Sequence, residues 1–598
     1  MMSQLRTVSA RVQRGERRRH DRKEEHQSST QLWVLASATY LLLVLLLFHK
    51  ALFSGHSAVG VGGDPYIFQW HLAWVAHALS HGTNPLFSRY ISTSNGGENL
   101  MYYTSLPLAG LLAWPVTALG GPVLSYNVVM VVSVVTSAVA AYAMCARFVS
   151  WKPAAFLGGL VYGFSPYMAA QSLGHPHLTM AWFPPVVVIV ADIVARGRRQ
   201  PVSLGVLFGI AVTAQLLLGT EILLTSVLLA ILGAIIWVVL FPREEGTTNL
   251  WRHGLPTLAV ATATVAVLGS FPLYMLVFGG HGVGIHSPLQ PRDVYVNDVT
   301  GFFVPGRIQL VSTTGSRSHV AHFSGNYVEA TAYVGAPLLL LLVFFLWKRW
   351  ADRTVRLAVI GAVICAVLSL GPRLHVNGAA GFRLPASILD RIPVLWNILP
   401  SRLMLYGYLA IALALAAIID RGRPDRRRLR LLGVGLCVAF LFPVSLPALH
   451  EVTPLAFRSV ARRGGAVLVT PAPTSLAQMY WQADTEFSVR LIGGFTLAAR
   501  PRNALLDAIE TGDSTGEWSR PTAEQADALR RSALQLGATV IIDVPDPDET
   551  QRRAFLAFLF GPSETSPDGF AVWHLPTRPN HDASSPQASA SVALEGSR

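Results

Sequence analysis

The chain has 598 residues, of which 52% are hydrophobic and only 14% are charged, and its mean hydropathy is +0.42. Soluble domains carry about 25% charged residues, so this composition excludes an ordinary soluble protein and is typical of a polytopic membrane protein. The formal net charge is +13, but from His450 onward the chain has 17 acidic and 13 basic residues. The positive excess therefore lies in the N-terminal tail and in short loops between apolar segments. This distribution argues against a nucleic-acid partner.

The first 30 residues are polar and basic, with Arg17, Arg18 and Arg19 in one run. This segment is too charged for the start of a signal peptide, and no small-residue cleavage site follows the next apolar run, so we predict a disordered cytoplasmic tail over 1–30. A transmembrane helix needs about 20 mostly apolar residues, and 31–49 is the first segment that meets this requirement. A polar and aromatic loop follows over 50–104.

Residues 105–121 are apolar, but Pro107, Pro115 and Gly120-Gly121 interrupt them. We therefore predict an interfacial or re-entrant helix there, on the outer side of the membrane. Together with 31–49, the further apolar segments predict about eleven transmembrane helices and a mainly α membrane domain over 31–447. These further spans are 125–146, 153–171, 178–195, 202–219, 222–241, 256–278, 331–347, 357–371, 402–419 and 431–447.

The basic residues indicate the orientation of these spans. If the N-terminal tail lies inside, every predicted inner connection is basic, for example at Arg196, Arg198 and Arg199, as the positive-inside rule requires. Counting 105–121 as a full span would instead place the arginine clusters outside. We therefore expect a multi-pass protein of the plasma (inner) membrane with a cytoplasmic N-terminus. The C-terminal region falls outside, as do the long polar loops 50–104, 279–330 and 372–401.

The composition changes at residue 448, and 448–575 is predicted to form a small α/β domain outside the membrane. It contains no nucleotide-binding loop and no Gly-x-Ser-x-Gly motif, so we interpret it as a lid or a docking module. The tail 576–598, which is rich in Ser, Ala and Pro, is predicted to be disordered. The expected strands of the domain are 465–470, 488–492, 538–543 and 569–575, and its expected helices are 501–510 and 522–536.

Asp64 is the leading candidate for a catalytic residue. It follows Gly62-Gly63 and precedes Pro65, just beyond the first predicted span. A carboxylate held there can act as a general base on an acceptor hydroxyl at the membrane surface. The alternative is a helix N-cap, because Asp-Pro before the helical run Tyr66–Leu79 is a good helix start.

The aromatic residues that follow Asp64 are expected to line a substrate cavity. They are Tyr66, Trp70 and Trp74, and burial against the two tryptophans would raise the pKa of Asp64. Glu98 is a second acid in the same outer loop, within a turn-rich sequence. It could bind substrate hydroxyls or a divalent ion, or it could be a solvated loop acid.

Two further acids lie at the predicted outer ends of spans. Glu221 stands between two apolar runs, where an ionisable group is costly and usually functional, so it could line a donor cavity; the alternative is a plain loop turn. Glu329 comes just before the predicted span 331–347, after a long loop of the kind that is usually functional. The alternative for Glu329 is again a solvated loop acid.

Three basic residues on the outer side are candidates for phosphate binding. His175 lies in Gly174-His175-Pro176-His177, where phosphate contact is favoured over a zinc site because no acidic third ligand lies nearby in the sequence; the alternative for this motif is anchoring at the membrane interface. Arg391 and Arg402 go against the charge bias of the outer side, and a forked guanidinium suits a phosphate. The alternative for both arginines is contact with lipid headgroups.

Five sets of short stretches resemble the GT-C superfamily, the multi-span glycosyltransferases that take sugars from polyprenyl-phosphate donors. The chain is most similar to bacterial YfhO-like and related actinobacterial membrane proteins, and the stretches cover most of 60–420 in the expected order. They are Gly63-Asp64-Pro65-Tyr66 with Trp70, Trp74 and Asn84-Pro85-Leu86; Tyr162-Gly163-Phe164-Ser165-Pro166-Tyr167 with Gly174-His175; Glu329 with Tyr333-Val334-Gly335; Leu370-Gly371-Pro372; and Leu384-Pro385 with Ile392-Pro393 and Arg402.

The resemblance implies an integral membrane glycosyltransferase, expected to be inverting, with Asp64 as the catalytic acid of the first outer loop. Its donor would be a polyprenyl-phosphate sugar presented among membrane lipids, and its acceptor a cell-envelope glycan, glycolipid or protein. Many members have two adjacent acids in this loop, whereas Asp64 has no acidic neighbour. The sequence therefore leaves open whether a divalent cation (Mg²⁺ or Mn²⁺) is needed, and no metal ligand is predicted. The alternatives are a transporter or flippase of lipid-linked glycans, and a non-catalytic envelope assembly protein on the same fold.

Overall fold

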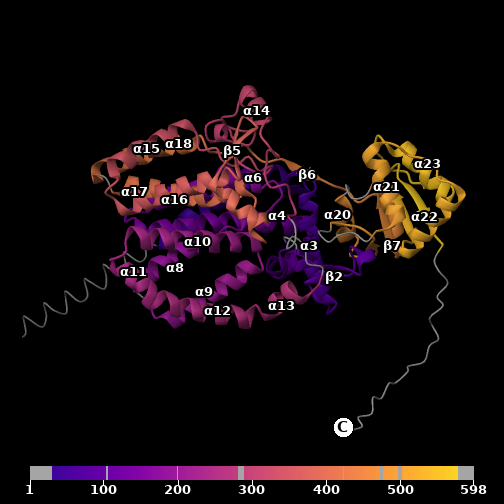
Figure 1. The fold of residues 1–598 in the computed structure, drawn as a ribbon, viewed down its shortest axis with the longest axis horizontal. Coiled ribbons are helices and arrows are strands. Elements are labelled where there is room, and N and C mark those ends of the chain that lie inside the picture. The colour runs from indigo at the N-terminus through magenta and orange to yellow at the C-terminus, as the bar shows by residue number, and fades with distance from the viewer. Residues whose placement is uncertain are drawn as a thin grey trace, which may run out of the picture. The chain divides into compact units, whose positions relative to one another are not determined.

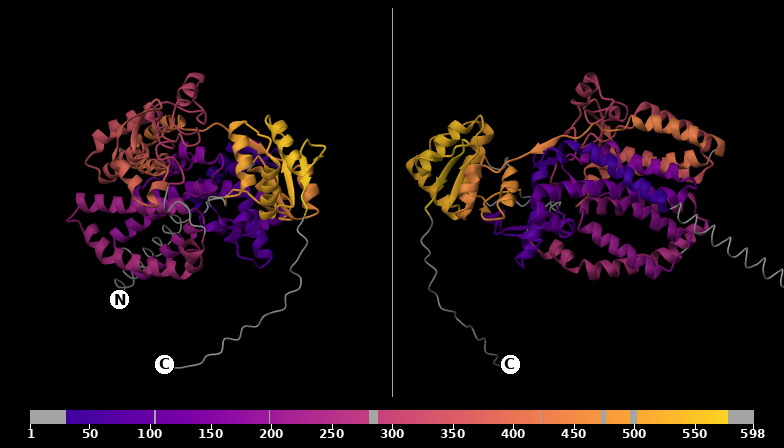
Figure 2. Two further views of the ribbon diagram at one scale, coloured as in Figure 1. Left: turned by 45° about the vertical axis from the view of Figure 1, so that its right-hand side comes forward. Right: turned by 180° about the vertical axis from the view of Figure 1, so that it is seen from behind.

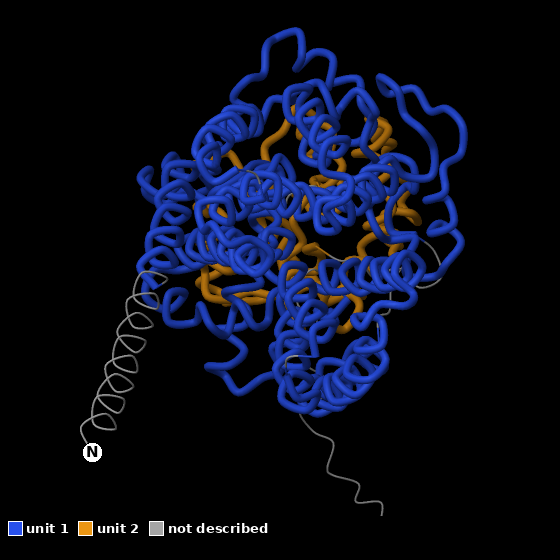
Figure 3. Tube along the Cα trace, turned by 90° about the vertical axis from the view of Figure 1, so that its left-hand side faces the viewer, with its two compact units in different colours: residues 1–88, 98–452, 497–499 blue, residues 89–97, 453–496, 500–598 orange. Residues whose placement is uncertain are grey.

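The computed structural model describes residues 30–576 except 103–104, 198, 281–287, 422, 472–475 and 496–501. Residues 1–29 and 577–598 lie outside the described residues, and they include all but residues 30 and 576 of the two tails predicted to be disordered. The described chain forms two compact units (Figure 3). The first unit contains the described residues up to Ser88 and those of Glu98–Val452. The second contains Arg89–Gly97 and the described residues from Thr453 onward.

The first unit is mostly helical, and Figure 1 shows its long helices running roughly side by side. Its helices are Thr30–Leu47, α2 (His49–Leu52), α3 (Asp64–Ser80), α4 (Pro107–Phe148), α5 (Lys152–Gly163), α6 (Pro166–Gln171), α7 (Pro176–Thr179), α8 (Phe183–Ala195), α9 (Pro201–Leu216), α10 (Thr220–Leu240), α11 (Glu245–Asn249), α12 (Leu255–Leu268), α13 (Ser270–Phe278), α14 (Thr314–Val320), α15 (Ala336–Arg349), α16 (Arg353–Ser369), α17 (Met404–Asp420) and α18 (Arg427–Ala439).

Three antiparallel pairs of short strands lie in the loops of this unit. β1 (Ser57–Val59) pairs with β6 (Ala448–His450), with Ala58 opposite Leu449. β2 (Phe87–Ser88) pairs with β3 (Glu98–Asn99), and β4 (Arg373–Val376) pairs with β5 (Ala379–Arg383). The pairing of β1 with β6 brings the start of the first predicted outer loop next to the chain that leaves the last helix.

The structure supports a multi-pass membrane protein but does not confirm eleven spans. Among the described residues, five helices are long and apolar enough to cross a membrane, or six if the bent pair α12 and α13 is one span. Several predicted spans are shorter or broken. Residues 153–171 form α5 and α6, separated at Ser165-Pro166, and 256–278 bends by 76° at Gly269. Hydropathy averages over such breaks, because Pro and Gly interrupt a helix without making the segment polar.

The segment predicted to be re-entrant, 105–121, continues into the following predicted span. Both belong to α4, whose helical geometry is interrupted at Gly121 (φ 75°, ψ −176°). A positive φ suits glycine, and Pro122 then restarts the helix with a fixed φ. The break therefore falls where the sequence predicts the first segment to end.

The interior of the first unit is built around α17. Of the 18 most apolar consecutive residues in α17 and its preceding turn, 89% are buried within the protein. The corresponding share in α10 is 17%. α17 packs against α16, α5 and α4, and α3 packs against α4. The outer helices expose large apolar side chains such as Val239, Phe278 and Trp347, as expected for surfaces that contact lipid.

The second unit contains a five-stranded sheet in the order β10–β11–β9–β7–β8, with helices packed against it (Figure 2). β7 is parallel to β8 and β9, whereas β11 is antiparallel to β9 and β10. Four of its strands overlap the four predicted strands. The elements are α19 (Leu455–Ala461), β7 (Ala466–Thr470), α20 (Ala477–Asp484), β8 (Arg490–Leu491), α21 (Ala504–Thr515), α22 (Ala523–Gln535), β9 (Val540–Asp543), α23 (Glu549–Phe560), β10 (Glu564–Thr565) and β11 (Ala571–His574).

Two local features hold this unit together. Thr522 caps α22 in a capping box with Gln525, which satisfies backbone N–H groups at the start of the helix. Arg552 in α23 is 1% exposed and donates to Asp543 at 2.5 Å, Asp513 at 2.9 Å and Asp546 at 2.7 Å. Because Asp543 ends β9, this buried network joins the sheet to two helices.

Candidate functional site

The start of α3 lies against the loop that contains His175. The backbone N–H of Val61 donates to the carbonyl of Leu173 at 2.9 Å. Gly60 has a φ of +125°, and a Cβ there would lie 2.3 Å from the same carbonyl oxygen; a Cβ on Gly174 would lie 3.2 Å from that of Asp64. The two loops therefore approach so closely because glycine occupies the contact positions.

Asp64 does not cap α3. The N-cap is Gly63, and no side-chain capping bond is present, so the N-cap interpretation of Asp64 is wrong. Instead, Oδ2 of Asp64 lies 3.0 Å from Nε2 of His175. The Asp64 side chain is 49% exposed and that of His175 is 16% exposed, so the carboxylate faces solvent while the imidazole lies behind it.

The pKa of Asp64 is lower than its ordinary value, although a raised pKa is predicted from burial against Trp70 and Trp74. Partial burial does raise it, but the hydrogen bond from His175 and the positive charges of His175 and Arg402 lower it more. The two tryptophans are buried and stack on each other, with ring centroids 5.7 Å apart, and Nε1 of Trp74 donates to the carbonyl of Pro85 at 3.1 Å. The carboxylate is therefore held in its ionised form.

A second charged group lies near Asp64. Nη1 of Arg402 donates to Glu221 at 2.6 Å, and Nη2 donates to Glu329 at 2.6 Å. Nε of Arg402 donates to Glu329 as well, at 3.0 Å. The three residues come from the 3₁₀ helix η7 (Pro400–Leu403), the first turn of α10 and the loop before α15.

This triad is largely shielded from solvent: the Glu329 side chain is 4% exposed, and those of Arg402 and Glu221 are 14% and 19% exposed. The interpretations of Glu329 as a solvated loop acid and of Glu221 as part of a plain turn are therefore wrong. Burial raises the pKa of Glu329, but the charge of Arg402 and its hydrogen bonds lower it more. Two carboxylates and one guanidinium leave a net negative charge, so the triad by itself does not attract an anion, and a phosphate bound at Arg402 would need His175 as well.

The triad and the Asp64–His175 pair form one electrostatic group. The charge of Arg402 acts on Asp64, and the charge of His175 acts on both glutamates. Five of the predicted site residues therefore lie together although they come from distant parts of the chain. Gln171 and Ser401 were not predicted as site residues, yet both donate to Oε2 of Glu329, at 3.3 and 3.1 Å. A glutamine within the apolar run Met168–Leu173 is the signal that could have found the first of them.

The remaining predicted residues lie elsewhere in the first unit. The Tyr66 hydroxyl donates to Glu451 at 2.8 Å. Glu98 is 1% exposed and lies opposite Ser88 in the β2–β3 pair, so its interpretation as a solvated loop acid is wrong. Arg391 is exposed at the end of η5 (Pro385–Arg391), and no hydrogen bond or ion pair joins it to another residue within the described chain.

A resident divalent cation does not fit these side chains. In the part of the chain that the structure describes, no group of three or more His, Cys, Asp or Glu residues is arranged to hold a metal ion. The acids of the site are already paired with basic groups: Glu221 and Glu329 bind Arg402, and Asp64 binds His175. A hard cation needs several free oxygen ligands.

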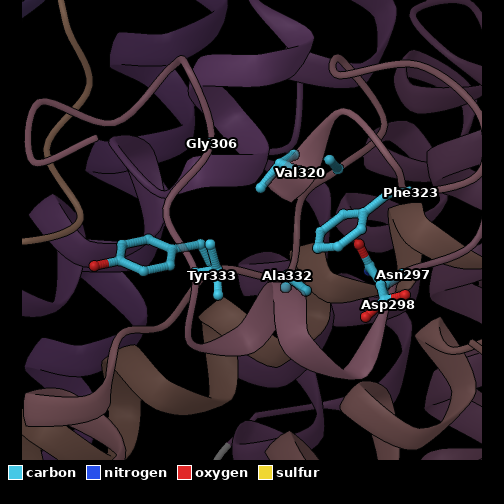
Figure 4. A pocket seen from close by; sticks show the side chains of 10 residues that line it. Asn297, Asp298, Gly306, Val320, Phe323, Ala332 and Tyr333 are labelled. Atoms are coloured by element: carbon cyan, nitrogen blue, oxygen red, sulfur yellow. The ribbon is translucent and has the colours of Figure 1, made fainter. Parts of the chain in front are cut away.

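A small pocket lies in the same unit, and Ala330, the chain neighbour of Glu329, is among its lining residues (Figure 4). Asn297, Asp298, Val320 and Phe323 line it, and its polar groups are used within the fold. Asp298 accepts from the N–H groups of Thr300 and Gly378 at 2.8 Å each, and Asn297 donates to the carbonyl of Ser401 at 3.2 Å. These polar side chains therefore hold the surrounding loops in place, and the pocket is not a candidate for the catalytic site.

Comparison with known proteins supports the fold. The model of a family described as "Domain of unknown function (DUF6311)" matches residues 36–442. The structure is similar to that of arabinofuranosyltransferase AftD from Mycobacteria, with a TM-score of 0.50 and 14% identity over 92% of this chain and 40% of that one. The chain thus spans well under half of AftD, and it shares the fold of the GT-C membrane glycosyltransferases, as the resemblance predicts.

A second solved structure is the oligosaccharyltransferase AglB from Archaeoglobus fulgidus, at 13% identity and a TM-score of 0.42 over 91% of this chain and 74% of that one. No curated protein is significantly similar to the chain in sequence.

Proposed function

The chain belongs to the DUF6311 family, and on that premise we propose that it is an integral membrane glycosyltransferase. It moves a sugar from a polyprenyl-phosphate donor to a cell-envelope glycan, glycolipid or protein on the outer face of the membrane. The observation that carries this proposal is the Asp64–His175 pair beside the buried Arg402 triad, on a fold shared with AftD.

Asp64 is the general base of the proposed reaction. Its half-exposed carboxylate accepts the proton of an acceptor hydroxyl, and the resulting oxygen attacks the anomeric carbon of the donor sugar. The bond from that carbon to the phosphate oxygen breaks, and the polyprenyl phosphate leaves with the bonding electrons. A single displacement of this kind inverts the anomeric configuration. The lowered pKa of Asp64 ensures that the base is ionised at neutral pH.

His175 and Arg402 bind the phosphate of the donor in this proposal. Each nitrogen of Arg402 already donates to a carboxylate, which leaves one N–H on each terminal nitrogen for a phosphate oxygen. Glu221 and Glu329 hold the guanidinium in place and shape the cavity. Arg391, which is exposed, meets phosphate groups at the membrane surface.

The buried residues Tyr66, Trp70, Trp74 and Glu98 contribute to the proposed cavity through the packing of α3 and of the β2–β3 pair. The proposal also places the N-terminus in the cytoplasm and the second unit outside, where that unit acts as a lid or a docking module for the acceptor.

The test is sugar transfer in membranes that contain the wild-type chain or Asp64→Asn. Radiolabelled polyprenyl-phosphate sugars are supplied, and label in the envelope fraction is measured at equal protein level. Asp293→Asn is the matched control, because Asp293 also pairs with a histidine, His375, at 3.1 Å. We expect Asp64→Asn to lose about 10²- to 10⁴-fold in rate and the control to retain transfer. Equal transfer by wild type and Asp64→Asn would contradict the assignment of Asp64 as the base, and no transfer by either would contradict the proposed function and favour a transporter or an assembly protein.

A further inference from the structure

Buried polar atoms without hydrogen-bond partners gather behind the Asp64–His175 pair. Within the described residues, the unpartnered atoms of this region include the Tyr167 hydroxyl, Oε1 of Gln171, Nδ1 of His175, both ring nitrogens of His177, Oε1 of Gln215 and Oε1 of Glu221. We call these six residues the interior polar cluster. Tyr167, Gln171 and Gln215 are fully buried, and His177 is 3% exposed.

Several contacts place these residues together. Gln171 donates to Glu329, whose partner Arg402 also binds Glu221. Tyr167 lies within the electrostatic reach of Glu221, Arg402 and Glu329.

The two remaining members join the cluster at the turn between α9 and α10. Nε2 of Gln215 donates to the carbonyl of Gly219 at 3.1 Å, and a Cβ on Gly219 would lie 2.7 Å from the carbonyl oxygen of His177. His177 also lies within the electrostatic reach of His175 and Arg402. The cluster therefore forms where the ends of α6, α7, α9, α10 and η7 converge.

Unpartnered polar groups are rare in protein interiors, because each loses its bonds to water on burial. A concentration of them at one place is therefore a sign of a polar ligand. The chemistry of the atoms narrows its class: the amide and carboxylate oxygens only accept, the tyrosine hydroxyl donates, and a neutral imidazole does both. A phosphate would leave the acceptors unpaired, whereas sugar hydroxyls donate and accept and so match the whole set.

We propose that the interior polar cluster receives the hydroxyl groups of the donor sugar and selects which sugar is transferred. This inference rests on the proposed function, to which it adds the residues that recognise the sugar. Asp64 stands at the exposed side of the sugar and the cluster at its buried side. Tyr167 and His177 each contribute a group that has no role in the fold's own hydrogen bonding.

The experiment compares the binding of two probes to the purified full chain: a polyprenyl-phosphate sugar, from a panel of pentoses and hexoses, and polyprenyl phosphate without a sugar. Binding is measured as the rise in unfolding temperature. The variant Tyr167→Phe removes only the unpartnered hydroxyl, and His177→Phe keeps the ring that stacks on Phe68 at 5.0 Å. Thr257→Val is the control, because Thr257 in α12 has a buried, unpartnered hydroxyl that is not part of the cluster.

We expect one sugar of the panel to raise the unfolding temperature of the wild type more than the bare phosphate does. Tyr167→Phe and His177→Phe should fold as well as the wild type, since no protein hydrogen bond is lost, but bind that sugar about tenfold or more weakly. Their binding of polyprenyl phosphate should be unchanged, and Thr257→Val should match the wild type in both.

Two results would overturn the inference: no sugar-dependent binding by the wild type, or sugar-dependent binding that both cluster variants retain, in which case the cluster holds only water. Transfer assays on the same proteins separate this inference from the proposed function. Sugar-dependent binding that the variants lose, without any transfer by the wild type, would support the cluster as a sugar site and contradict the transferase.

Discussion

Nε2 of His175 lies 3.0 Å from Oδ2 of Asp64, although α3, α4, α5 and α6 separate the two residues in the chain. The contact turns a lone acid in a loop into one member of a charge-stabilised pair. It also directs the other ring nitrogen of His175 toward the interior, where it has no partner among the described residues. The pair thus connects an exposed base to a buried polar cluster.

The first prediction concerns the pH dependence of transfer. A base must be ionised, so the rate falls as pH drops through the pKa of Asp64, which His175 and Arg402 hold below its ordinary value. In His175→Gln the hydrogen bond can remain but the positive charge is lost, so the pKa of Asp64 rises and the acidic limb of the pH–rate profile moves to higher pH. His375→Gln, in the Asp293–His375 pair, should leave the profile unchanged. An acidic limb at the wild-type position in His175→Gln would show that the histidine does not act on the base.

The second prediction concerns the buried triad. Arg402→Met leaves Glu221 and Glu329 without their cation, and an uncompensated buried charge destabilises a protein by about 3–5 kcal/mol. We expect a clear fall in the unfolding temperature of the purified protein in detergent. Adding Glu221→Gln and Glu329→Gln to Arg402→Met should recover much of the loss, because neutral amides need no counter-charge. If the triple variant is no more stable than Arg402→Met, the penalty does not come from the carboxylates.

The third prediction concerns the loop before Asp64. Gly60→Ala would place a Cβ 2.3 Å from the carbonyl oxygen of Leu173 at a φ of +125°, so the two loops must move apart. A displacement of about 1 Å at a catalytic group can lower a rate by about 10²-fold, and we expect such a loss of transfer. Gly62→Ala is the matched control: Gly62 has a φ of +73° but nothing within 4 Å of a new Cβ. It should cost only the backbone strain, about 1–2 kcal/mol, and keep most of the activity. Similar rates in the two variants would indicate that the spacing of the loops does not matter.

The fourth prediction concerns the second unit. Arg552→Met removes the cation that binds Asp543, Asp513 and Asp546 in the interior, and should destabilise this unit by about 3–5 kcal/mol. Hydrogen exchange of the full chain should show faster exchange in β9 and α23 and little change in α17. Arg531→Met replaces an exposed arginine in α22 and should change stability by less than about 0.5 kcal/mol. Unchanged protection of β9 in Arg552→Met would show that the ion network does not hold the sheet.

Much of the architecture follows from local sequence. A long apolar run such as Thr220–Leu240 predicts a helix from its composition, and Ala466–Thr470 and Val540–Asp543 predict strands from theirs. These assignments hold because they depend on neighbours in the chain. The count of eleven spans is not confirmed, because Gly269 bends α12 against α13 and Ser165-Pro166 divides α5 from α6, and an average of hydropathy does not register such breaks.

The sequence by itself also determined which residues to examine, because an acid or an arginine at the end of an apolar run is costly and needs a reason. Only the tertiary structure decided their partners. Arg402 could have met a headgroup, a phosphate or a carboxylate, and it is the packing of η7 against α10 and the loop before α15 that gives it Glu221 and Glu329. In the same way, Asp64 could have capped α3, but the close approach of Gly60 and Gly174 brings His175 to it. Desolvated charges take the partner that the fold places within hydrogen-bonding distance, and that distance is a property of the packed chain.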